Sequence, residues 1–396
     1  MSTAAKIVDT DTRVMDGRSW RDFCRALEAA GEIILAPPTH AAPIDRAEGY
    51  RYLTRLTRIA LEMMLEHADP DFPTFYAASH TTAKIGGDNP DNLYQNATIT
   101  GDRDYRIYGQ RGTVPYLSFG TKANRYATEG TMASTGELEA RDMVFAADGS
   151  FEIAVSRERK PGNWLPLAAD TSMLLVRQTF LDRPNETAAE VKVEKVGAPA
   201  KPAPLTPERL DRGLAAAAAF VNGTARTFVA WVEEFRKYPN TFAPFPQETC
   251  YRTGGDPLIH YLHGYWELAA DEALVIDSEV PECEIWNFQL DNYWMESLDY
   301  RYLPACWNKH TARYNADGTV TFVIGARDPG HATSWTRPGT SAARCCCAGP
   351  GRRAIPCRAA GSSSSRASRA PARVDRHSCC GFRPPVSTPA FPRTLP

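Results

Sequence analysis

The chain has 396 residues, of which 43% are apolar and 23% are charged. These values are ordinary for a globular protein and exclude collagen-like, mostly disordered and small disulfide-rich classes. No apolar run approaches the roughly 20 residues that a membrane-spanning helix needs. The first residues show no apolar stretch after a basic start, so they do not resemble a signal peptide. We therefore expect a cytoplasmic protein with no membrane association.

The charge is divided unevenly along the chain. The segment after His331 holds 11 of the 45 basic residues and one of the 47 acidic residues, so the body before it is strongly acidic. An acidic body disfavours nucleic-acid binding. Six of the ten cysteines also lie after His331, and the other four show no CxxC spacing. This pattern predicts neither a zinc site nor a disulfide framework. With no nucleotide-binding motif present, we expect no cofactor.

The segment after His331 has two interpretations. One is a disordered basic arm. The other, which we favour, is a reading-frame slip in GC-rich DNA. Codons exist for which WTRPGTSAARCCCAGPGRR, shifted by one nucleotide, reads LDTAGHVGGTMLLRWAGATG, and this alternative string has the apolar pattern of a strand. We predict that residues 332–396 are disordered and non-native.

In chain order, helical periodicity comes first and β character follows. Trp20, Phe23 and Leu27 recur at helical spacing, and a second helix is expected from Arg46 to about His67. Short aromatic and β-branched runs separated by turn signals then indicate antiparallel strands. The predicted segments are 1–18 (flexible N-terminus), 19–72 (helical region), 73–196 (first β unit), 197–207 (linker), 208–240 (helix), 241–331 (second β unit) and 332–396 (tail).

Two strings repeat one pattern about 169 residues apart. ADGSFEIAVSRERKPGNW begins at Ala147 and ADGTVTFVIGARDPGH begins at Ala316. Each has an Asp-Gly turn, an alternating strand, a basic and acidic pair, and Pro-Gly. We predict an α+β, mainly β fold with two related antiparallel β-sandwich or jelly-roll-like units and helical additions. The frame slip would leave the second unit truncated, without its last strand or two.

A combination of motifs resembles a known family of bacterial proteins, those carrying the domain of unknown function numbered 1214. The resemblance covers most of residues 19–331 and implies a β-rich, jelly-roll-like structure, but no established reaction. In that family ARDPGH leads into a segment like NWLDTAGH, from which this chain departs. The motifs are GYRYL from Gly49, GDNPDNLY from Gly87, YRIYGQRG from Tyr105, PGNWLPL from Pro161, RQTFLDR from Arg177, WNFQLDNYWMESLDYR from Trp286 and ARDPGH from Ala326.

The strand predicted around WNFQLDN offers the best candidate site. Side chains alternate between the two faces of a strand, so Asn287, Gln289 and Asp291 share one face. Two amides and a carboxylate in a row can bind sugar hydroxyls, a carboxylate or an amide. Trp294 lies close enough in sequence to add an aromatic platform. The alternative interpretation is an outer sheet face that meets water or another element.

A second candidate is the loop of Arg327, Asp328 and His331. The first two form an ion pair that either fixes a turn or lies at the rim of a pocket, together with Tyr265. His331 and Asp291 are the candidate catalytic acid or base, since an unperturbed imidazole titrates near pH 6.5.

The HxxH pair His260 and His263 suggests a metal only if it lies on a helix. IHYLHGYW favours a strand, and we expect aromatic packing and no metal.

Together these features predict a protein that binds or transforms a small polar organic ligand. If it is an enzyme, a cofactor-independent hydrolase, lyase or isomerase is expected. The alternative is a non-enzymatic accessory or assembly protein whose β-sandwich surface binds a partner protein. The sequence leaves a homo-oligomer open.

Overall fold

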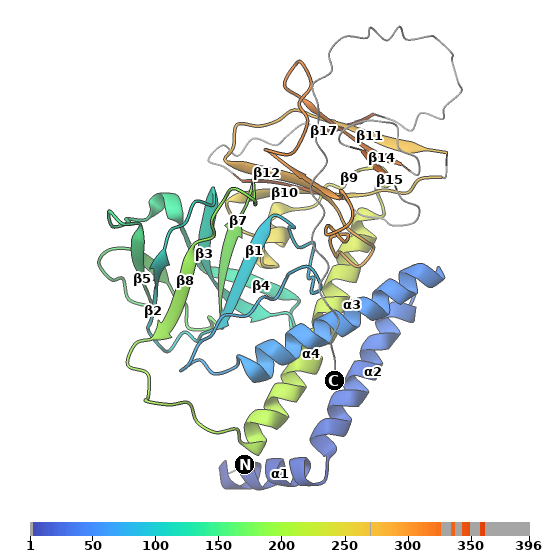
Figure 1. The fold of residues 1–396 in the computed structure, drawn as a ribbon. Helices are drawn as coiled ribbons and strands as arrows, with labels where there is room; N and C mark the ends of the chain where they lie inside the picture. Colours follow the sequence, from blue (N-terminus) through green and yellow to red (C-terminus); the bar gives the residue numbers. More distant parts are fainter. Residues whose placement is uncertain (1–2, 270, 326–333, 337–342, 349–356, 361–396) are drawn as a thin grey trace, which may run out of the picture. The chain divides into compact units, whose positions relative to one another are not determined.

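The computed structural model describes residues 3–269, 271–325, 334–336, 343–348 and 357–360 (Figure 1). Its helical part is centred on one long helix, α4, against which α2 and α3 pack. Thr206 begins α4 as predicted, because its side chain accepts a hydrogen bond from the Arg209 N–H at 3.2 Å. The helices are α1 (Thr3–Met15), α2 (Arg18–Leu35), α3 (Pro43–Leu61) with a π turn (Glu62–Glu66), α4 (Pro207–Phe235) and α5 (Gln247–Arg252).

The first β unit is a sandwich of two four-stranded sheets, ordered β1-β7-β3-β4 and β6-β5-β2-β8. Apolar side chains from both sheets, among them Phe119, Ile153 and Val176, form the core between them. A 3-10 turn (Ala140–Asp142) follows β4. The strands are β1 (Asn92–Thr98), β2 (Tyr105–Gln110), β3 (Tyr116–Arg125), β4 (Thr131–Glu139), β5 (Ser150–Ser156), β6 (Trp164–Pro166), β7 (Met173–Thr179) and β8 (Glu190–Lys195).

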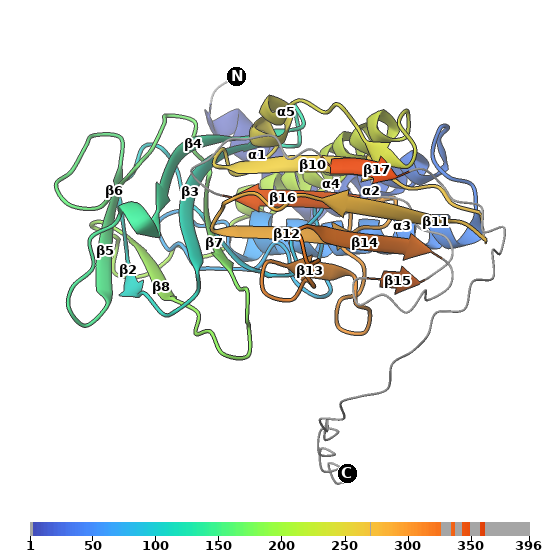
Figure 2. The same cartoon turned by 90° about the horizontal axis from the view of Figure 1, so that it is seen from above.

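The second β unit is also a sandwich, with sheets ordered β13-β12-β16-β10-β9 and β15-β14-β11-β17. Figure 2 shows these strands from above. Phe288 of β12 stacks on Phe322 of β14 with ring centroids 4.1 Å apart, in the core between the sheets. The strands are β9 (Thr241–Phe242), β10 (Ile259–Tyr265), β11 (Ala273–Ser278), β12 (Ile285–Leu290), β13 (Cys306–Asn308), β14 (Val320–Gly325), β15 (Ser334–Thr336), β16 (Ala343–Ala348) and β17 (Cys357–Ala360).

The two units share one strand order. The series β1-β7-β3-β4 has its counterpart in β10-β16-β12-β13, and β6-β5-β2-β8 has its counterpart in β15-β14-β11-β17. The two Asp-Gly turns lie at matching places. Gly149 precedes β5 with a φ of 81°, and Gly318 precedes β14 with a φ of 84°. Each strand then pairs antiparallel on one side and parallel on the other.

Two features differ from the sequence-based expectation. The segment expected to be a flexible N-terminus contains α1, and Arg13 of this helix forms an ion pair with Asp211 of α4 at 3.1 Å. In the second unit, β16 and β17 occupy the positions of β7 and β8, where we expected strands to be missing. The frame slip and the disorder of the tail concern a segment that lies mostly outside the described residues, and both stay predictions. Among the described residues, no helix has the length and apolar character to cross a membrane.

Candidate functional site

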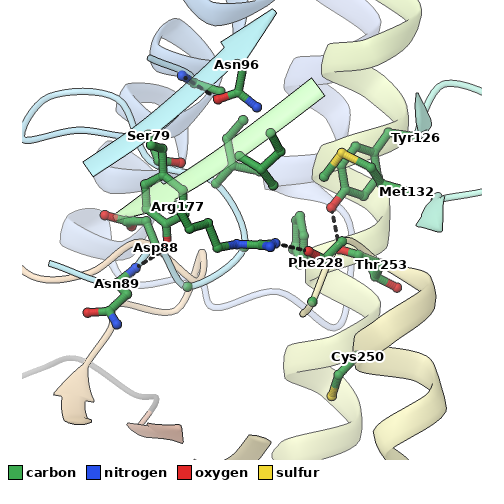
Figure 3. Close-up of a pocket in the computed structure, with 18 of the residues that line it drawn as sticks. Ser79, Asp88, Asn89, Asn96, Tyr126, Met132, Arg177, Phe228, Cys250 and Thr253 are labelled. Atoms are coloured by element: carbon green, nitrogen blue, oxygen red, sulfur yellow. Dashed lines mark hydrogen bonds between the residues drawn. The ribbon is translucent and has the colours of Figure 1, made fainter. Parts of the chain in front are cut away.

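A cavity of about 130 Å³ lies beside the first β unit, on the face of sheet β1-β7-β3-β4 that points away from the sandwich core (Figure 3). Strands β1 and β7 form its floor and helix α4 one wall. The loop of residues 86–89 and the segment from α5 to β10 complete it. The cavity is therefore built from both β units and the long helix, which lie far apart in the sequence.

Much of the cavity wall is apolar and flexible. Phe220 and Phe228 project from α4, and Tyr126 packs against both rings with centroids 5.9 and 5.8 Å away. Three methionines add polarizable thioethers, which adapt to ligands of different shape. They are Met63, Met132 and Met173.

Two asparagines bring amide donors to this wall. Asn96 of β1 is buried, and its Nδ2 donates to Met173 Sδ at 3.4 Å. Asn124 of β3 donates from its Nδ2 to Met63 Sδ at 3.5 Å. Thioether sulfur is a weak acceptor, so both amides hold donors that a ligand oxygen would satisfy better. Their carbonyl oxygens accept from backbone N–H groups, which fixes the orientation of each amide.

A buried guanidinium lies at another side of the cavity. Arg177 of β7 donates from Nη2 to the Gly254 carbonyl at 2.5 Å, and Figure 3 shows it extending toward the Thr253 segment. Its Nη1 is 3.5 Å from Asp256 Oδ2. Ser118 also donates to this Asp256 oxygen at 3.3 Å, and the Tyr116 hydroxyl lies 3.1 Å from it and 2.6 Å from Glu139 Oε1. The carboxylate therefore balances the buried cation, as burial of a charge requires.

The predicted amides and carboxylate of β12 do lie together. Asn287 donates to Gln289 Oε1 at 3.0 Å, and Gln289 donates to Asp291 Oδ1 at 2.7 Å. All three are buried. Another element covers them, because Gln289 also donates to the Asp88 carbonyl at 2.9 Å and Asn287 to Asn89 Oδ1 at 3.4 Å. The structure thus places this polar face against the loop of residues 86–89, which lines the cavity.

The same loop is held by buried charges. Lys84 donates to the Ser297 hydroxyl at 2.8 Å, and this hydroxyl donates to Asp88 Oδ2 at 2.8 Å. Burial lowers the pKa of Lys84 and raises the pKa of Asp88. Farther along the loop, burial raises the pKa of Asp91 to about 6. These contacts anchor one wall of the cavity to the second β unit.

Two other predicted site residues lie elsewhere. Trp294 is buried, donates from Nε1 to the Asp45 carbonyl at 2.8 Å and stacks on Tyr52. Tyr265 is buried beside His40, with 2.8 Å between its hydroxyl and the imidazole Nε2. Neither lines the cavity. The predicted residues Arg327, Asp328 and His331 lie outside the described residues.

The HxxH pair lies on strand β10, as expected. Residues three apart on a strand face opposite sides. His263 lines the cavity, where it stacks on Phe235 with centroids 4.8 Å apart. Within the described part of the chain, no group of three or more metal-ligating side chains is found.

Sequence reasoning missed Arg177, Asn96 and Asn124 as site residues. One signal was present, because a strand reading MLLVRQT places a charged residue directly after an apolar run. An arginine there has to find a buried partner.

The fold and the cavity define a protein of two β-sandwich units and a helical layer, with a cavity at their junction. Residues 94–180 match the family model described as "Protein of unknown function (DUF1214)". A putative uncharacterized protein from Burkholderia cenocepacia is 49% identical over 88% of this chain and 98% of its own, with a TM-score of 0.86. The chain belongs to the family of proteins that carry DUF1214.

A protein from Vibrio parahaemolyticus is 11% identical, over 79% of this chain and 98% of its own, with a TM-score of 0.45. No curated protein matches the chain.

Proposed function

We propose that the protein binds a small organic ligand with an apolar body and an oxygen-bearing head in the cavity between β1, β7 and α4. The observation that carries this proposal is the pair of amide donors, Asn96 and Asn124, whose hydrogen bonds end on methionine sulfur. A carboxylate or carbonyl oxygen would replace these weak bonds with stronger ones. The methionines and aromatic rings would contact the apolar body.

The cavity volume limits the ligand. An apolar cavity of about 150 Å³ holds one benzene molecule. A cavity of about 130 Å³ therefore suits a compact ligand, such as a small aromatic or branched aliphatic monocarboxylate. Arg177 adds positive charge on the same wall, although Asp256 offsets much of it. The accessory-protein alternative has less support, because the most exposed large apolar side chains, such as Met15, Val144 and Tyr302, come from separate segments.

The test is a thermal-shift screen of small monocarboxylates, amides and ketones, followed by calorimetry on the hits. Asn124→Asp keeps the side-chain shape but replaces an amide donor with a carboxylate. It should weaken a carboxylate ligand by at least about tenfold, as loss of one hydrogen bond to a charged group implies. Gln110→Glu, at the exposed last position of β2, adds the same charge away from the cavity and should leave the affinity unchanged. Equal affinities in the two variants, or no hit in the screen, would refute the proposal.

We further infer that the two units descend from one duplicated unit. Their shared strand order and matching Asp-Gly turns support this. The frame slip gains support from the position of β16, which pairs with both β10 and β12, as β7 pairs with β1 and β3. The alternative frame reads MLLRW from position 345, close to the MLLVRQT of β7.

A further inference from the structure

A thiol and an imidazole meet in the wall of the cavity. Cys250 lies in α5 and His263 on β10, and the distance from Sγ to Nε2 is 3.6 Å. Both residues are buried and both line the cavity. Figure 3 shows Cys250 and Thr253 on the same side of the cavity. A nucleophile and a base in hydrogen-bonding reach of each other, facing a ligand-sized space, form the core of cysteine-dependent acyl transfer.

Aromatic rings fix the imidazole in place. Phe235 lies parallel to the His263 ring, with an angle of 7° between the planes. Phe245 and Trp231 approach it edge-on, with centroids 5.7 Å away in each case. These ring contacts limit rotation of the imidazole, so Nε2 stays directed at the thiol.

We propose that Cys250 is a nucleophile and His263 its general base, acting on an ester or thioester held in the cavity. Sγ forms a bond to the acyl carbon while its proton passes to His263 Nε2. The bond from the acyl carbon to the leaving oxygen or sulfur then breaks, and His263 returns the proton to that atom. Water next attacks the acyl carbon of the thioester while His263 takes one of its protons. The bond from the acyl carbon to Sγ then breaks, His263 returns the proton to Sγ, and a carboxylic acid is released. This inference deepens the proposed function, because the released acid has the chemistry expected of the cavity ligand.

The chain carries its own control for thiol reactivity. Cys24 of α2 is exposed and has no structural reason to be activated. The full-length protein is treated with 4-nitrophenyl acetate or, separately, with iodoacetamide, and each cysteine is followed by peptide mass spectrometry. We expect acetylation of Cys250 and at least tenfold faster alkylation of Cys250 than of Cys24 at pH 7. A model thiol with a pKa near 8.5 reacts roughly 25-fold faster at pH 9 than at pH 7, because its thiolate fraction rises from about 3% to about 76%. Cys250 should change by less than about threefold.

Two variants separate the roles of the pair. Cys250→Ser should lose the acetylated peptide, and His263→Gln should flatten the difference in rate between Cys250 and Cys24. If His263→Gln does not fold, the pH profile of Cys250 in the parent protein decides alone. A Cys250 that stays unmodified while Cys24 reacts, or that follows the pH profile of Cys24, overturns the proposal. Because acetylation and thermal shift are separate measurements, a ligand that binds without acetylation would refute only the chemistry. Acetylation without any ligand hit would refute only the ligand class.

Discussion

Replacing Gly49 with alanine tests how the helical region is joined to the second β unit. Gly49 lies on α3, and a Cβ atom there would lie 2.5 Å from Cζ2 of Trp294 and 2.8 Å from Cγ2 of Ile34. Ordinary contacts between carbon atoms are about 3.5–4.0 Å, so the indole has to move by roughly 1 Å. Its hydrogen bond to the Asp45 carbonyl opposes that movement. Such overpacking costs about 1–3 kcal/mol.

Gly31→Ala supplies the matched control. Gly31 lies on α2, and the nearest atom to its added Cβ is Cε1 of Tyr50 at 3.9 Å, an ordinary contact. Both substitutions gain about 0.8–1.0 kcal/mol of helix propensity, so this contribution cancels in the comparison. We expect Gly31→Ala to be the more stable of the two by about 1–3 kcal/mol in urea unfolding followed by tryptophan fluorescence. Equal stabilisation by both variants would show that Trp294 does not pack on α3 as described.

Three further predictions concern buried charge and the tail. Burial raises the pKa of Asp91 from 3.8 to about 6, so the native state loses stability as the pH rises from about 4 to above 6. In urea unfolding at pH 8, the free energy of unfolding of Asp91→Asn should therefore exceed that of the parent by up to about 3 kcal/mol. This difference should vanish near pH 4. Lys122 is fully buried and pairs with Glu137, so Lys122→Met should lower the free energy of unfolding by about 3 kcal/mol. Adding Glu137→Gln to that variant should recover part of the loss. Equal losses in the single and the double variant would contradict the pairing. Restoring the alternative frame after His331 should raise soluble yield and the thermal midpoint; an unbroken gene whose product has the expected intact mass would refute the slip.

Alternation along the chain predicted which face of a strand is buried in a core, but not what covers its other face. Trp286, Phe288 and Leu290 lie in the core of the second unit, as the alternation of the strand predicted. The opposite face, with Gln289, meets the carbonyl of Asp88, which is 201 residues away in sequence. Local patterns carry no information about such a distant partner. The loop that covers this face could therefore not be predicted, and the face was interpreted as a ligand site.

The cavity itself was beyond sequence reasoning for the same physical reason. Its residues come from β1, β3, β7, α4 and β10, and each has an ordinary local explanation as strand or helix interior. Helix α1 was missed because the ion pair that ties it to α4, between Arg13 and Asp211, joins residues 198 apart. By contrast, the cap at Thr206 and the Asp-Gly turns were predictable, since their hydrogen bonds close within three residues.

Lys122 and Arg177 carry buried charges on the side of their sheet that most two-layer sandwiches leave to solvent. Their counter-charges do not all belong to the same unit, because Asp256 is contributed by the chain beyond α4. A fragment ending before α4 would therefore lack Asp256, the partner of the Arg177 guanidinium. It would also expose Met173 and Leu175 of β7 to solvent. We therefore expect the two β units to fold in one cooperative step, and neither unit to fold stably by itself.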